Sequence, residues 1–341
     1  MTTRSILAGC GAYLPDRVID NNELAKLVDT SDDWIKQRTG IEKRHVVADG
    51  ELTSDLAVKA ADRALSKANI AANDIDLIIV ATTTPDRTFP ATATKVQADL
   101  GIMSGAAFDI QAVCAGFVYA MSVADNLLRA GQSRKALVIG AETFTRLLDW
   151  TDRGTCVLFG DGAGAIILDS HEIEPSAKQY GVLSTHLHSD GRYRDILYVD
   201  GGPSMNSKAG YVRMSGKEVF RHAVSKLGSV INEALVANNL SSNDIDWLVP
   251  HQANKRIIES MAKKLNMPMD KVICSIDHHA NTSAASVPLA LTEGVSDGRI
   301  VDGDLVLFEA IGGGLAWGAG LGSMGYPEYY LNMYLGQSKL I

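Results

Sequence analysis

The stretch Asn73-Asp74-Ile75-Asp76-Leu77-Ile78-Ile79-Val80 returns about 170 residues later as Asn243-Asp244-Ile245-Asp246-Trp247-Leu248-Val249-Pro250. Each copy has a polar start followed by an apolar run of the kind that forms a buried strand. Predicted elements recur in one order around both copies: a helix before (56–68; 219–238), a helix after (91–100; 252–265), then two strand-like runs (107–113 and 136–140; 272–278 and 304–308). Self-similarity at this spacing predicts duplication of a whole fold unit rather than a solenoid.

Strands that alternate with helices predict an α/β fold with mostly parallel sheets covered by helices. We expect two tightly packed halves, residues 1–174 and 175–324, because no Pro/Ser-rich linker separates them. The segment 171–178 is the predicted seam. Residues 325–341 do not fit the repeated pattern and are interpreted as a tail, to which no function is assigned.

Composition narrows the function classes. The 341 residues are enough for sizeable cores, and 46% hydrophobic with 21% charged residues is typical of a globular protein. A net charge of -8 argues against a nucleic-acid binder. The four cysteines are widely spaced and include no C-x-x-C pair, which favours a reducing compartment over disulfides or a zinc site. Without a signal peptide or an 18-residue apolar run, we expect a cytoplasmic protein that does not enter membranes.

A candidate nucleophile lies in Asp109-Ile-Gln-Ala-Val-Cys114-Ala-Gly-Phe117, between a strand-like and a helix-like run. Small residues on both sides of Cys114 suit a sharp strand-to-helix turn, as in the nucleophile elbow of hydrolases. The positive end of a helix dipole favours the thiolate, which is the attacking species. The alternative is a small buried cysteine without reactivity.

Two further polar residues follow strand-like runs of the second half. His251 comes directly after the strand ending at Pro250 and is predicted to open a helix, and Asn281 lies between another strand-like run and a helix. Asn281 and Cys114 fall at nearly equivalent places in the duplicated frame, so we expect all three at one central site at the strands' carboxyl ends. Each could instead be an ordinary helix cap. The glycines 312–314 would let backbone N–H groups approach an oxyanion, or simply form a tight turn.

These segments together resemble a known family. The motifs, in chain order, are Ala112-Val-Cys-Ala-Gly-Phe117, Asp152-Arg-Gly-Thr155, Phe159-Gly-Asp-Gly-Ala-Gly164, His251-Gln-Ala-Asn254, Asn281-Thr-Ser-Ala-Ala-Ser286 and Gly312-Gly-Gly-Leu-Ala-Trp-Gly318. Over residues 4 to 320 the chain is similar to β-ketoacyl-acyl-carrier-protein synthase III, the initiating condensing enzyme of type II fatty acid synthesis. The resemblance implies a thiolase-like, duplicated, five-layered α-β-α-β-α fold with mixed, mostly parallel sheets, and a homodimer.

The resemblance also implies a reaction. Cys114 would take an acyl group, with acetyl as the expected primer, from acyl-CoA. His251 and Asn281 would hydrogen-bond the thioester carbonyl of malonyl-acyl carrier protein and stabilise the enolate left by decarboxylation. Backbone N–H groups of Cys114 and Gly313 would form the oxyanion hole. Decarboxylation makes the carbanion without a strong base, so the site needs neutral donors, and His251 is expected to be neutral. Acyl-CoA is a substrate, and no cofactor or metal is expected.

Binding residues follow from the same resemblance. Trp34, Arg38 and Arg153 would contact CoA; independently, Trp34 and Arg38 share one helix face by spacing, although Trp34 could simply anchor a helix. The positions for acyl carrier protein form a basic face on the helix after His251, with a solvated charged face as the alternative; they are Arg221, Gln252, Lys255, Arg256, Lys263 and Lys264. The acyl-pocket positions are Phe89, reaching across the dimer, Phe144 and Ile311.

Several features depart from the family or compete with it. His279-Ala280 stands where many members have an aromatic residue and Gly, and Ile311 stands where some have Phe. The glycine-rich run 160–165 precedes a strand-like run rather than a helix, which disfavours a nicotinamide site. His186 and His188 are interpreted as strand-end residues. Ala310 replaces the second cysteine of thiolases. A secondary-metabolism synthase with another primer, and a silent CoA- or carrier-binding protein, remain alternatives.

Overall fold

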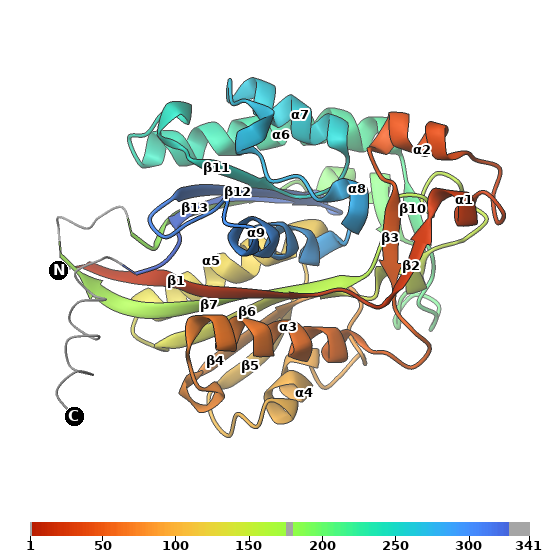
Figure 1. Cartoon of the computed structure of the whole chain (residues 1–341). Helices are drawn as coiled ribbons and strands as arrows, with labels where there is room; N and C mark the ends of the chain where they lie inside the picture. The colour runs from red at the N-terminus through yellow and green to blue at the C-terminus, as the bar shows by residue number, and fades with distance from the viewer. Residues whose placement is uncertain (1, 175–179, 327–341) are drawn as a thin grey trace.

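Two β-sheets organise the protein, whose computed structural model describes residues 2–174 and 180–326 (Figure 1). The first sheet has the strand order β1 (Thr2–Tyr13), β7 (Gly162–Ile173), β6 (Lys135–Glu142), β4 (Leu77–Ala81), β5 (Ala106–Ile110). The second has the order β11 (Trp247–Pro250), β12 (Leu305–Gly312), β13 (Ala316–Ser323), β8 (Val182–Ser189). The duplicated stretches that open the sequence become β4 and β11, and both are almost wholly buried.

Both sheets are mixed, but the predicted predominance of parallel pairing is wrong. Strand β4 pairs in parallel with β5 and β6, and β11 pairs in parallel with β12. The ladders β1–β7, β6–β7, β12–β13 and β8–β13 are antiparallel. A short turn joins β12 directly to β13, and such a turn permits only antiparallel pairing, because parallel neighbours need a longer crossover.

Helices complete five layers, as the resemblance implied (Figure 1). One outer layer contains α3 (Thr53–Ala68) and α4 (Thr92–Asp99), and the other contains α6 (Gly216–Ala237) and α7 (Lys255–Lys264). Between the sheets lie α5 (Gly116–Arg129) and α9 (Ser286–Ser296). Small residues bring this central layer close to the first sheet: a Cβ on Gly140 would lie 2.2 Å from the Ala284 carbonyl oxygen, and one on Gly164 would lie 2.7 Å from the Leu289 nitrogen.

The predicted helices are present, with one shifted boundary and one strand missing. Helix α7 begins at Lys255 rather than near His251, because the Asn254 side chain caps it by accepting a hydrogen bond from the Arg256 N–H at 2.9 Å. The predicted strand 272–278 is reduced to a single bridge between Val272 and Leu248. The chain then forms the one-turn helix α8 (Ile276–His279). Strand β11, with which the predicted strand would pair, ends at Pro250. Proline has no N–H and cannot extend the ladder between β11 and the segment after Val272.

The sheets follow the two halves of the sequence. Every strand of the first sheet lies within residues 2–173, and every strand of the second lies within 182–323. We therefore propose 1–174 and 175–324 as the duplicated units. Residues 175–178 of the predicted seam and 327–341 of the predicted tail lie outside the described residues. Among the described helices, none has the length and apolar character needed to cross a membrane.

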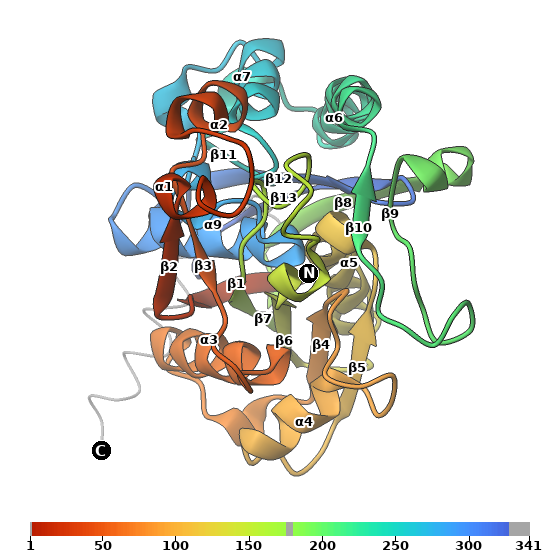
Figure 2. The ribbon, with the colours of Figure 1, turned by 90° about the vertical axis from the view of Figure 1, so that its right-hand side faces the viewer.

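Smaller elements gather at one end of the layers (Figure 2). They are the ribbon β2 (Arg17–Asp20) and β3 (Lys43–Val46), the ribbon β9 (Leu197–Val199) and β10 (Val212–Met214), and helices α1 (Asn21–Leu24) and α2 (Asp32–Thr39). The parallel strands β4 and β11 end on this side, so side chains that follow those strands meet beneath these elements.

Candidate active site

Cys114 lies in a short 3-10 turn, Val113–Ala115, between β5 and α5. Val113 has φ 49°, a left-handed conformation that β-branched residues rarely adopt, so the turn before the thiol is strained. The second sheet approaches this turn closely, because a Cβ on Gly312 would lie 2.6 Å from the Cys114 nitrogen. The predicted sharp turn is therefore present, with the thiol held between the two sheets.

The predicted thiolate is wrong for the free protein. Cys114 is only 3% exposed, and burial raises the pKa of its thiol to about 12. A hydrogen bond with the Ser283 hydroxyl lowers this pKa, and the nearby Glu142 carboxylate raises it further. Desolvation of the charged form outweighs the favourable dipole of a helix that starts two residues later. Cys114 is therefore a neutral thiol at rest.

His251 follows β11 directly and extends its pairing, because its N–H donates to the Glu309 carbonyl at 2.8 Å. Its side chain is 3% exposed, and burial lowers the pKa of the imidazole to about 3, in agreement with the predicted neutral form. The Ser286 hydroxyl lies 2.5 Å from Nδ1 and accepts from the Gln252 N–H at 3.3 Å. The Ser286 hydroxyl can then donate its proton to Nδ1. The imidazole therefore carries its own proton on Nε2, and Nε2 is a donor.

Asn281 follows α8 and precedes a second 3-10 turn, Ser283–Ala285. Its Oδ1 accepts from the Ser283 N–H at 2.9 Å, which assigns the orientation of the amide and leaves Nδ2 as a donor. The preceding Ala280 has φ 59° and ψ -163°, a conformation that is essentially confined to glycine. The alanine at this position therefore holds the turn in a strained form.

Contacts between the two 3-10 turns bring the three candidates together. The turn containing Cys114 packs on Ser283–Ala285, which follows Asn281, and Ser286 at the end of that turn contacts His251. Val113 and Ser283 both have positive φ, at 49° and 51°, so the turns correspond residue for residue. The structural counterpart of Cys114 is therefore Ala284, three residues beyond Asn281.

Glu142 and the two serines are site residues that the sequence reasoning missed. Glu142 is fully buried at the end of β6 and accepts from the hydroxyls of Thr83 at 2.7 Å, Thr84 at 2.7 Å and Ser283 at 3.0 Å. Burial raises the pKa of its carboxyl, and these hydrogen bonds oppose the rise. The sequence did contain a signal for Glu142, because it is an acidic residue at the carboxyl end of a strand predicted to be buried, where functional residues gather.

A cavity of about 1080 Å³ opens beside the nucleophile turn. Val113, Gly313 and Phe144 line it, and the β9 strand forms part of its wall. Gly313 and Phe144 therefore both line a cavity beside Cys114, and the roles expected of them stay predictions. Two other predicted pocket positions do not line this cavity: Phe89 is 81% exposed, and Ile311 packs in a core cluster with Leu315.

The comparisons with known proteins agree on one family. The model described as 3-oxoacyl-[acyl-carrier-protein (ACP)] synthase III matches residues 108–191, and the model of its C-terminal part matches 235–323. A Rhodospirillum centenum protein named beta-ketoacyl-[acyl-carrier-protein] synthase III is 64% identical over 321 residues, covering 94% of this chain and 99% of that protein. The chain belongs to the 3-oxoacyl-[acyl-carrier-protein] synthase III family.

Solved structures confirm the thiolase-like fold predicted for a member of this family. The 3-oxoacyl-[acyl-carrier-protein] synthase III of Aquifex aeolicus is 43% identical with a TM-score of 0.88, covering 93% of this chain and 99% of that one. The priming β-ketosynthase of the R1128 polyketide pathway is 32% identical with a TM-score of 0.89, covering 96% and 98%.

The three predicted CoA residues form one group on the surface. The guanidinium carbons of Arg38 and Arg153 lie 4.4 and 4.8 Å from the centre of the Trp34 ring. Arg153 is held there by the Asp29 carbonyl, at 2.8 Å. An adenine between Trp34 and Arg153 would need about 7 Å, two stacking distances of ~3.5 Å each. If a base is to lie between the two, Arg153 must first move away from the Trp34 ring.

The predicted carrier-protein positions divide into an exposed group and one core residue. The exposed basic side chains lie on α6 and α7; they are Arg221, Lys255, Arg256, Lys263 and Lys264. Gln252 was wrongly placed among them. It is fully buried, and its amide bonds the backbone of Pro250 at 2.8 Å, Ile273 at 3.1 Å and Ser275 at 2.9 Å. Gln252 therefore positions the loop after β11 and is inaccessible to a partner.

Proposed function

We propose that this protein catalyses the decarboxylating condensation of an acyl-CoA primer with malonyl-acyl carrier protein. The products are 3-oxoacyl-acyl carrier protein, CO2 and CoA, and the reaction initiates fatty acid synthesis. Family membership supports this activity. The observation that carries it is the pairing of a buried thiol, Cys114, with two neutral side chains, His251 and Asn281, on adjoining turns. Such a site suits carbanion chemistry without a strong base.

In the first half-reaction, the Cys114 sulfur attacks the acyl-CoA carbonyl. The Cys114 S–C bond forms, the bond from carbon to the CoA sulfur breaks, and the thiol proton ends on the departing CoA thiolate. Backbone N–H groups of Cys114 and Gly313 would stabilise the oxyanion. Because the resting thiol is neutral, its proton must leave during attack, and the Ser283 hydroxyl lies between the thiol and the Glu142 carboxylate.

In the second half-reaction, malonyl-acyl carrier protein places its thioester carbonyl against His251 Nε2 and Asn281 Nδ2. The bond to the carboxylate breaks, CO2 leaves, and the electron pair forms an enolate that the two donors stabilise. The enolate carbon attacks the acyl-Cys114 carbonyl, a C–C bond forms, and the Cys114 thiolate leaves and takes from solvent the one proton that the overall reaction consumes. Neutral donors suit this step, because a cation would also stabilise the starting carboxylate and so bring less net gain.

Binding roles complete the proposal. Trp34, Arg38 and Arg153 would hold the CoA nucleotide, and the exposed basic side chains of α6 and α7 would dock the acidic carrier protein. Phe144 would line the acyl pocket. Exposed Phe89 would reach the pocket of a second copy in a homodimer. A cytoplasmic location is part of the proposal, supported by four cysteines that form no disulfide.

A polyketide-priming synthase is the second candidate, favoured by the similarity to the R1128 enzyme. Incubation of the protein with acyl-CoA thioesters from acetyl to decanoyl, straight and branched, separates the two candidates by intact mass and peptide mapping. Acylation of Cys114 by acetyl-CoA, absent in Cys114→Ala, is expected. Acylation only by longer or branched esters would favour the priming role. No acylation by any ester would refute the CoA-primed mechanism.

A further inference from the structure

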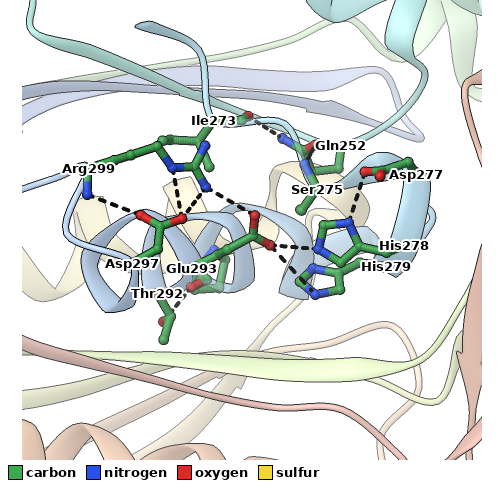
Figure 3. Close-up of polar contacts among 11 residues, drawn as sticks. Gln252, Ile273, Ser275, Asp277, His278, His279, Thr292, Glu293, Asp297 and Arg299 are labelled. Carbon is green, nitrogen blue, oxygen red and sulfur yellow. Dashed lines mark hydrogen bonds and ion pairs between the residues drawn. The ribbon is translucent and has the colours of Figure 1, made fainter. Parts of the chain in front are cut away.

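A cluster of metal-ligand side chains lies next to the turn that contains Asn281 (Figure 3). His278 and His279 end α8, and Glu293 projects from α9. One ring nitrogen of each histidine and one carboxylate oxygen lie within 4.8 Å of one another. The Glu293 Oε2 is the common point, 2.8 Å from His278 Nε2 and 3.8 Å from His279 Nε2.

Neighbouring side chains hold two of these groups in place. His278 Nδ1 lies 2.9 Å from the Asp277 carboxylate, which orients the ring so that Nε2 faces Glu293. Arg299 donates to Glu293 Oε1 at 3.1 Å and also pairs with Asp297, which turns Oε2 toward the histidines. A carboxylate on the far nitrogen of a histidine and a hydrogen-bonded carboxylate ligand are the usual outer partners of a metal site.

Among the residues that the structure describes, His279 is the member of the cluster without a hydrogen bond. It is 8% exposed, its Nδ1 has no hydrogen-bond partner, and its Nε2 lies beyond hydrogen-bond distance from Glu293. Its Nε2 faces the Glu293 carboxylate without forming a hydrogen bond to it, and a neutral imidazole nitrogen in that position can bind a metal ion.

We propose that His278 Nε2, His279 Nε2 and Glu293 Oε2 form a site for a divalent transition-metal ion such as Zn²⁺, with water as a fourth ligand. Two imidazoles and a carboxylate are ligands that Zn²⁺ accepts in tetrahedral geometry. The ion would replace the proton that His278 shares with Glu293. The cluster with both imidazoles neutral has a net negative charge, which a divalent cation offsets. The charge comes from three carboxylates, those of Asp277, Glu293 and Asp297, and is only partly balanced by the guanidinium of Arg299.

A metal ion at this site would link helix α8 to helix α9. Glu293 lies on α9, whereas both histidines immediately precede Ala280 and Asn281. A bound ion would thus tie the strained turn to α9 and restrict the position of the Asn281 amide. We expect the ion to raise the thermal midpoint of the protein, because a ligand that binds only the folded state stabilises it.

The experiment uses the full chain after chelator treatment and dialysis. Zn²⁺ binding is measured by equilibrium dialysis with elemental analysis, and Co²⁺ serves as a probe whose visible spectrum reports coordination geometry. We expect one Zn²⁺ per chain, a tetrahedral Co²⁺ spectrum and a higher thermal midpoint. His278→Arg keeps a cation beside Glu293 but removes a ligand, and it should weaken binding at least about tenfold, as loss of one ligand does.

His188→Gln is the matched control, because His188 also pairs with a glutamate, Glu233, at 2.6 Å on the other side of the second sheet. This variant should bind Zn²⁺ as the wild type does. The proposal is overturned if millimolar Zn²⁺ leaves the wild type metal-free, if His278→Arg binds as tightly as the wild type, or if only His188→Gln loses the ion. Should His278→Arg fold poorly by circular dichroism, Glu293→Gln replaces it under the same criteria.

Discussion

Ser286 provides a direct test of how the neutral donor is prepared. Its hydroxyl is 2.5 Å from His251 Nδ1, and both residues are almost fully buried, at 1% and 3% exposure. If this hydroxyl donates to Nδ1, the imidazole proton is fixed on Nε2, which faces the substrate carbonyl. Ser286→Ala removes the hydroxyl without adding bulk, so Nδ1 loses its partner and the other tautomer becomes accessible.

The magnitude follows from the burial of the pair. A buried group left without its hydrogen bond loses about 1–3 kcal/mol. If that loss falls on the donor tautomer in the transition state, decarboxylation slows about fivefold to 100-fold, since ~1.4 kcal/mol corresponds to a factor of ten. Acylation of Cys114 does not use the Nε2 proton, so its rate should stay within about twofold of the wild type.

The assay separates the two half-reactions. Acyl-Cys114 formation from acyl-CoA is followed by intact mass, and CO2 release from malonyl-acyl carrier protein is followed on enzyme that is already acylated. Ser122→Ala is a suitable control, because Ser122 is a buried serine that bonds the Thr185 hydroxyl at 2.7 Å, away from His251. Unchanged CO2 release in Ser286→Ala would refute the tautomer assignment, and an equal loss in both half-reactions would show a general structural effect.

Three further results are expected. Alkylation of Cys114 by iodoacetamide should rise with pH and show no plateau up to about pH 10, because burial raises the pKa of the thiol to about 12 and only the thiolate reacts; a plateau near neutral pH would restore the thiolate hypothesis. Arg256→Glu should raise the KM for malonyl-acyl carrier protein about threefold to tenfold and leave acylation unchanged, whereas Lys67→Glu on the opposite outer layer should change neither; equal KM values would exclude docking on α7. Trp34→Ala should raise the KM for acyl-CoA about fivefold to 30-fold through lost stacking, but not the KM for a short acyl thioester without the nucleotide, and a matching rise for both substrates would argue against a nucleotide contact.

Much of the architecture was readable in the sequence because local patterns repeat. The two copies of the Asn-Asp-Ile-Asp stretch became β4 and β11 at corresponding places in the two sheets, and the helices around them followed the predicted order. Hydrophobic periodicity records which face of an element is buried, so it determines such elements without knowledge of their neighbours. The placement of Cys114 and His251 after strands also followed from this order, since strand ends collect at one edge, whereas Asn281 follows helix α8 and not the predicted strand.

Other properties depended on what each side chain meets after the halves pack together. Only tertiary burial raises the pKa of the Cys114 thiol above its ordinary value, because desolvation outweighs a helix dipole that the sequence can indicate. Gln252 lies three residues before the exposed Lys255, yet its bonds to Ile273 and Ser275 place it in the core. The same holds for His279 and Glu293, which meet across two helices. Charge, tautomer and ligand geometry arise from these long-range contacts, and neither periodicity nor spacing encodes them.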